Sequence, residues 1–116
     1  MAFQEVLGAL LAAPGARGAA FLDPQGQAIA AAGDHEALET LTAYQSVWVG
    51  ELRRAAERAG LGAVEDVTMD FETARVLTAQ VKDGYFLFLV VDRDGLLAPV
   101  RARLGVAREA LAHEIS

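Results

Sequence analysis

The sequence predicts an α+β (α/β) sandwich in which helices cover both faces of one sheet. Two turn sequences, Asp23-Pro24-Gln25-Gly26 and Asp83-Gly84, each lie between apolar stretches, as in β-hairpins. Apolar side chains at helical three- and four-residue spacing mark the start, the middle and the end of the chain. The run Tyr85–Val91 shows no alternation, which is expected of a central strand buried on both faces. Together these observations predict the order α-β-β-α-β-β-β-α.

A short helix followed by a hairpin is predicted at the start of the chain. The apolar stripe of the helix consists of Phe3, Val6, Leu7, Leu10 and Leu11. Pro14-Gly15 should end it, because proline cannot continue the hydrogen-bond ladder and glycine readily adopts a positive φ. Strands over Gly18–Leu22 and Ala28–Ala32 then flank a turn with proline in its second position and glycine in its last.

The longest predicted helix runs from Asp34 to Ala59, with Asp34 as its cap and Gly60 as its stop. It carries two apolar stripes where a surface helix needs one. The predicted core stripe consists of Leu38, Leu41, Tyr44, Trp48, Leu52 and Ala55. The second stripe consists of Thr40, Ala43, Val47 and Gly50, bounded by Glu51 and Arg54.

The second stripe predicts contact with a partner. Gly50 costs a helix interior roughly 1 kcal/mol relative to alanine, so its presence indicates close approach by another backbone. Arg54 borders the stripe and is placed to steer an acidic partner, although its position near the negative end of the helix dipole is another explanation. The alternative for the whole stripe is a solvated face that tolerates small residues.

Three strands and a helix are predicted after the long helix. Val64–Phe71 alternates between apolar and polar residues, as an edge strand does. Its acidic residues usually protect an edge against aggregation, so pairing with a second copy requires a register that keeps like charges apart. Arg75–Val81 and Tyr85–Val91 form the second hairpin. Pro99 lies in the first turn of the final helix, whose apolar side consists of Val100, Leu104, Ala107, Leu111 and Ile115.

Composition narrows the function classes. The 116 residues predict one domain, 1–116, with a net charge of -6 and no cysteine. The acidic balance argues against nucleic acid as a partner, since such affinity depends on clustered Lys and Arg. Met1–Glu5 does not resemble a secretory signal, and Tyr85–Val91 is too short to cross a bilayer. We therefore expect a cytoplasmic protein without direct membrane insertion.

Candidate catalytic residues are sparse. His35, His113, Ser46 and Ser116 could supply a nucleophile and a base, but no nucleophile-elbow pattern surrounds either serine. Gly15-Ala16-Arg17-Gly18 lacks the Lys-Ser/Thr end of a phosphate-binding loop. Asp92-Arg93-Asp94-Gly95 resembles only the start of a calcium loop, and the Glu109 and His113 pair is too small for a metal site. We expect no enzyme, no metal and no cofactor.

The order of elements resembles that of the roadblock/dynein light-chain family, including its bacterial, MglB-like members. The resemblance covers Phe3 to Ile115. It is carried by four segments: Phe3-Gln4-Glu5-Val6-Leu7, Gly18-Ala19-Ala20-Phe21-Leu22-Asp23, Leu38-Glu39-Thr40-Leu41 and Lys82-Asp83-Gly84-Tyr85. It implies a five-stranded, mostly antiparallel sheet of order 2-1-5-4-3. The long helix would cover one face and the terminal helices the other.

The resemblance also implies a homodimer in which strand three pairs with its symmetry mate and the two long helices lie side by side. The implied dimer interface consists of Val64, Asp66, Val67, Thr68, Met69, Asp70 and Phe71. The implied partner is a small Ras-like, MglA-like GTPase, docked on Thr40, Ala43, Val47, Gly50 and Arg54. Such regulators accelerate GTP hydrolysis by repositioning the residues of the GTPase, without inserting an arginine.

Two features depart from that family pattern. The chain has no helical extension after its last predicted helix, and bulky Val47 and Trp48 stand where MglB-like members tend to be small. The resemblance therefore implies GTPase binding more directly than GTPase activation. The alternative function is a dimeric adaptor for a motor, polarity or membrane-anchored assembly without a GTPase. A small-molecule sensor would need a convergent set of polar pocket residues, which the sequence does not offer.

Overall fold

The computed structural model describes residues 3–115, except for the side chain of Ser46. Five antiparallel strands form one sheet of order β2-β1-β5-β4-β3, so β5 is central and β2 and β3 are the edges. The strands are β1 (Ala16–Leu22), β2 (Ala28–Gly33), β3 (Asp66–Asp70), β4 (Ala74–Lys82) and β5 (Tyr85–Asp92). The helices are α1 (Phe3–Leu10), α2 (His35–Arg58) and α3 (Leu97–Glu114). The predicted order and fold class are confirmed.

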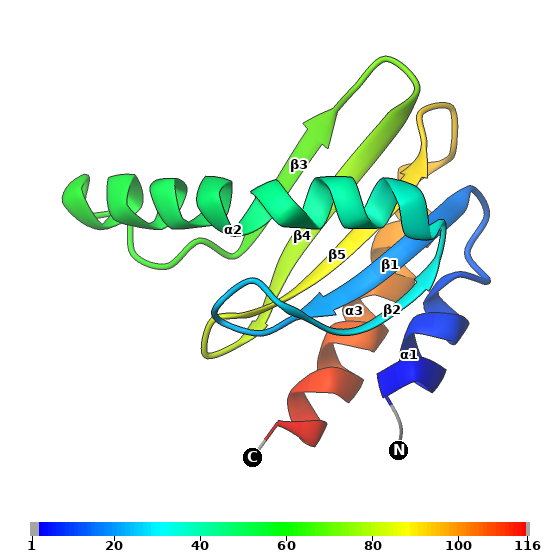
Figure 1. Cartoon of the computed structure of the whole chain (residues 1–116), viewed down its shortest axis with the longest axis horizontal. Coiled ribbons are helices and arrows are strands. Elements are labelled where there is room, and N and C mark those ends of the chain that lie inside the picture. Colours follow the sequence, from blue (N-terminus) through cyan, green and yellow to red (C-terminus); the bar gives the residue numbers. More distant parts are fainter. Residues whose placement is uncertain (1–2, 116) are drawn as a thin grey trace.

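Helix α2 covers one face of the sheet, and α1 and α3 cover the other (Figure 1). The larger core lies on the α1 and α3 side, where Phe21, Leu87 and Leu111 have no exposed surface. The smaller core lies under α2 and includes Leu38 and Phe88. Successive residues of β5 therefore point into different cores, and Phe86 to Val91 are all buried. This explains why the sequence of β5 is apolar at every position.

Both hairpin turns form as their sequences predict. Asp83 and Gly84 have φ values of 49° and 86°, the left-handed conformations that a two-residue turn needs. At the first turn, Gly26 has a φ of 86° and donates its N–H to the Asp23 carbonyl at 2.9 Å. The Asp23 carboxylate also accepts hydrogen bonds from the backbone N–H groups of Gln25 and Gln27. These local bonds fix the register of both hairpins.

The ends of α2 are capped as expected. The Asp34 carboxylate accepts a hydrogen bond from the Ala37 N–H at 3.2 Å. At the other end, Gly60 has a φ of 72°, and the Leu61 N–H donates to the Ala56 carbonyl at 2.8 Å. This six-to-one bond with a left-handed glycine is a Schellman motif, which satisfies carbonyls that the helix would otherwise leave free.

The predicted core stripe of α2 is wrong in phase. Leu38 is buried and Leu41 half-buried, but Tyr44 is 61% exposed and Leu52 43% exposed. Ala55 is exposed and Trp48 only half-buried. The inward positions are instead Leu38, Gln45 and Val49, with 3%, 2% and 7% of their surfaces exposed. Tertiary contact has rotated the helix so that a glutamine, which the apolar pattern had excluded, points to the sheet.

Helix α2 is also longer than the part of the sheet against which it packs. Its 24 residues extend for about 36 Å at 1.5 Å per residue. It packs mainly against β1 and β2, and Figure 1 shows its C-terminal half reaching past the strands. We call this half, residues 47–58, the overhang. Apart from Trp48, Val49, Gly50 and Ala56, its residues are all exposed.

Candidate interaction surface on helix α2 and strand β3

The residues of the predicted second stripe lie on the side of α2 that faces away from the sheet. Thr40, Ala43 and Arg54 are exposed, and Val47 is 59% exposed. Tyr44, which the sequence pattern had assigned to the core, joins them at 61% exposure. We call Thr40, Ala43, Tyr44, Val47 and Arg54 the outer α2 surface. The structure thus brings four of the five predicted residues together on one exposed surface and adds an aromatic one.

Gly50 lies beside this surface and is half-buried. A Cβ atom added to Gly50 would approach only the Arg54 guanidinium, at 3.8 and 3.9 Å, which is ordinary van der Waals contact. The close backbone approach that the sequence predicted is therefore not made within residues 3–115. Arg54 itself pairs with the Glu51 carboxylate one turn away, and both side chains remain mostly exposed. Such surface pairs contribute little to stability, so Arg54 keeps its charge available to another molecule.

Strand β3 presents unpaired backbone groups along one edge. The Gln80 N–H donates to the Glu65 carbonyl and the Phe71 N–H to the Ala74 carbonyl, both at 2.8 Å. Backbone bonding alternates along an antiparallel strand, so Asp66, Thr68 and Asp70 direct their N–H and C=O groups away from β4. Thr68 is the midpoint of this open edge.

The regular part of β3 is shorter than the predicted Val64–Phe71. Val64 and Phe71 flank it, half-buried and 43% exposed respectively. Val67 and Met69 are half-buried, and Met69 packs against the core under α2. The polar side chains of β3 therefore lie on the face of the sheet that carries α3.

Arginines compensate the acidic side chains of this edge. The Asp70 carboxylate accepts hydrogen bonds from Arg75 and lies 3.8 Å from the Arg93 guanidinium. The hydrogen bond from Arg75 is the main reason why the pKa of the Asp70 carboxyl is below its usual value. Arg108 of α3 lies 3.5 Å from the Asp66 carboxylate. Repulsion between the acidic side chains of two paired β3 strands is thus reduced, because both acids of β3 have cationic partners in their own chain.

Two buried polar atoms lie beneath α2 without a hydrogen-bond partner among the described residues. They are the side-chain oxygens of Gln45 and Thr78, each in a residue only 2% exposed. Thr78 is two positions from Val76 in β4 and so points to the same face. A buried acceptor without a partner costs about 1–3 kcal/mol of stability. The sequence pattern did not single out either residue, because a single polar residue leaves the spacing of the apolar residues around it unchanged.

Replacing Gln45 should therefore stabilise the fold. Gln45→Met keeps the length of the side chain and removes the unsatisfied carbonyl oxygen, so we expect the free energy of unfolding to rise by about 1 kcal/mol. Chemical denaturation measures this. Gln25→Met, at an exposed turn position, is the control and should leave stability unchanged. A destabilised Gln45→Met variant would show that the amide makes a stabilising interaction.

The two histidines considered for catalysis lie far apart in the fold. His35 and His113 are exposed, on helices that cover opposite faces of the sheet. Ser116 and the side chain of Ser46 lie outside the described residues. Among the residues described, no three His, Asp or Glu side chains gather closely enough to hold a metal ion, and no helix is long and apolar enough to span a membrane. Arg17 of the glycine-rich turn pairs instead with Asp34 and Asp92.

The strand order β2-β1-β5-β4-β3, with α2 on one face of the sheet and α1 and α3 on the other, defines a small α+β sandwich. The family model for the Roadblock/LC7 domain matches residues 2–91. The chain belongs to the Roadblock/LC7 family. The family and the MglB-like neighbours support a small regulatory or adaptor protein.

Solved structures agree with this assignment. The gliding protein MglB from Thermus thermophilus is 25% identical, with a TM-score of 0.84 over 96% of this chain and 86% of that chain. MglB from Myxococcus xanthus is 19% identical, with a TM-score of 0.89 over 97% and 93% of the two chains. A Roadblock/LC7 domain from Streptomyces avermitilis is 16% identical, with a TM-score of 0.87 over 97% and 96%. A search of curated proteins found no match.

Proposed function

We propose that the chain is a cytoplasmic, non-enzymatic homodimer that binds a small Ras-like GTPase and modulates its GTP hydrolysis. The single observation that carries the proposal is the overhang of α2, a helical segment with little sheet beneath it. The outer α2 surface beside it exposes Tyr44 and Val47. Exposure of these apolar groups to water is unfavourable in a monomer, and a partner would bury them.

The open edge of β3 supports the homodimer. Antiparallel pairing of β3 with a second copy would join the two sheets and satisfy the outward backbone groups of Asp66, Thr68 and Asp70. Val64, Val67, Met69 and Phe71 would complete the interface. The same two-fold axis would bring the two α2 helices together and cover part of the overhang. One MglB structure that is 25% identical to this chain has a tetrameric arrangement, so self-association occurs among its structural relatives.

The GTPase as partner is supported by the family and by the similarity to MglB. Calorimetric titration of the dimer with a small Ras-like GTPase from the same genome tests it. We expect tighter binding to the GTP-loaded form, because the switch regions change with the γ-phosphate. The rate of GTP hydrolysis, measured in the same mixtures, shows whether binding also modulates the reaction. No binding to either form by a folded dimer would favour the adaptor function instead.

Arg54 should affect how fast the partner associates. It lies exposed at the border of the outer α2 surface and, as a rim charge, would steer an acidic surface during encounter. We expect Arg54→Ala to lower the association rate constant several-fold at low salt, with little change in the dissociation rate constant. Stopped-flow mixing at two salt concentrations measures both. GTP hydrolysis should persist in this variant, whereas loss of a catalytic arginine would abolish acceleration.

A further inference from the structure

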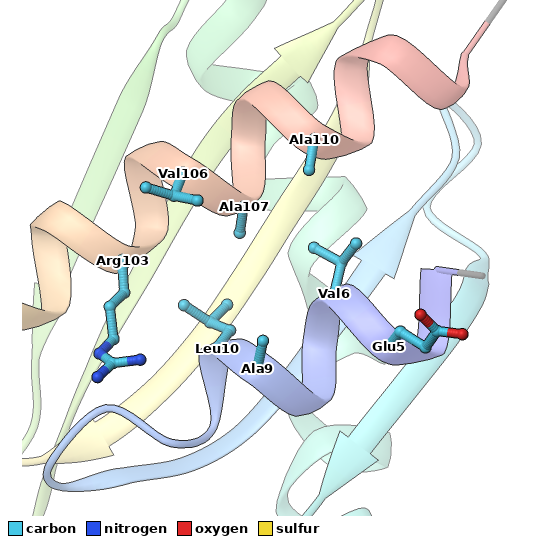
Figure 2. Close-up of a pocket in the computed structure, with 8 residues that line it drawn as sticks. All are labelled: Glu5, Val6, Ala9, Leu10, Arg103, Val106, Ala107 and Ala110. Atoms are coloured by element: carbon cyan, nitrogen blue, oxygen red, sulfur yellow. The ribbon is translucent and has the colours of Figure 1, made fainter. Parts of the chain in front are cut away.

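Helices α1 and α3 leave an apolar groove of about 460 Å³ between them, on the face of the sheet opposite α2 (Figure 2). Buried Val6, Leu10 and Ala107 form its floor. Val106 stands at its wall with 69% of its surface exposed. Between its two ends the groove is lined by alanine, valine and leucine.

Glu5 and Arg103 are the two charged residues that line the groove. The sequence of α1 has one charged residue, Glu5.

The two charges of the groove lie at its opposite ends and on different helices. Figure 2 shows Glu5 near the start of α1 and Arg103 on α3 at the diagonally opposite corner. Within residues 3–115, neither side chain has an ion-pair partner. A two-fold axis through the middle of the groove exchanges these two corners. The groove is therefore complementary in charge to a rotated copy of itself.

We propose that this groove is a second self-association surface, in which two copies of the chain pack face to face about a two-fold axis. Glu5 of each copy then faces Arg103 of the other, and Val106 of each copy packs against the small residues of the other groove. This isologous contact uses neither the β3 edge nor the outer α2 surface. It does not depend on the proposed function, and both contacts can form in one assembly.

Charge reversal tests the geometry directly. Glu5→Arg alone places like charges at both ends of the contact, and so does Arg103→Glu alone. Each variant should self-associate more weakly than wild type, by about ten-fold or more in dissociation constant. When the two single variants are mixed, each end of a heterodimer contact again joins a carboxylate to a guanidinium, one pair being reversed and the other unchanged. We therefore expect the mixture to associate as strongly as wild type, which sedimentation velocity can measure.

The experiment is best performed in a Thr68→Pro background, in which the β3 contact is removed. A background chain that stays monomeric up to millimolar concentration would overturn the proposal. Self-association of the single variants equal to that of their parent would also overturn it, as would failure of two folded single variants to associate on mixing. If instead β3 pairing does not occur, Thr68→Pro changes nothing and the charge-reversal comparison still reports on the groove.

Discussion

The Thr68→Pro variant should be a monomer at concentrations where the wild-type chain is a dimer. Thr68 lies at the midpoint of the open edge of β3 and directs its N–H away from β4, so proline there removes no hydrogen bond of the sheet. It removes a donor from the proposed contact with the second copy, and its ring obstructs the approach of that strand. We expect the dissociation constant to rise by about 100-fold or more, which corresponds to about 2.7 kcal/mol.

At micromolar concentrations below those at which the groove contact forms, light scattering should then give one chain mass for Thr68→Pro and twice that mass for wild type. Thr68→Ala is the matched control, because it removes the hydroxyl that accepts a hydrogen bond from Arg101 but keeps the backbone N–H. It should remain a dimer. A wild-type chain that is strictly monomeric at micromolar concentration would remove the β3 interface, as would a dimer of the proline variant that Glu5→Arg leaves intact.

Ala43→Arg should strongly weaken partner binding while leaving the fold and the dimer intact. Ala43 is exposed in the middle of the outer α2 surface, between Thr40 and Val47. A long charged side chain at that position would be buried without a counter-charge on contact with an apolar partner surface. We expect the affinity for the GTP-loaded GTPase to fall by about 100-fold, or about 2.7 kcal/mol.

The same calorimetric titration measures this loss. Ala98→Arg serves as the control, because Ala98 is exposed in α3, on the opposite face of the sheet. That variant should bind as wild type does. Equal binding by wild type and Ala43→Arg, with a folded dimer in both, would place the partner surface elsewhere on the molecule.

The order of elements could be predicted because local signals fix it. Asp83-Gly84 and Asp23-Pro24-Gln25-Gly26 set their turns through backbone conformation and nearby hydrogen bonds, whatever the rest of the chain does. The burial of β5 on both faces was likewise visible in its composition. The strand order followed only from the family resemblance, since turn signals do not say which strand lies next to which beyond each hairpin.

The phase of α2 could not be predicted in the same way. Tyr44 fits an apolar stripe by its spacing, and Gln45 does not, yet the helix buries Gln45 and exposes Tyr44. The apolar pattern assumed that the core stripe runs the whole length of the helix, whereas the overhang has little sheet to pack against. The ion pairs that neutralise Asp66 and Asp70 could also not be predicted from the sequence. Their arginines, Arg93 and Arg108, come from later parts of the chain.

Because of the overhang, the two halves of α2 should tolerate amino-acid substitutions to different degrees during evolution. A substitution near Leu38 disturbs a core, whereas exposed positions such as Leu52 and Arg53 tolerate most replacements at little cost in stability. The far half can therefore drift in sequence without loss of the monomer fold. Related chains built on this plan can acquire different partners while they share one scaffold.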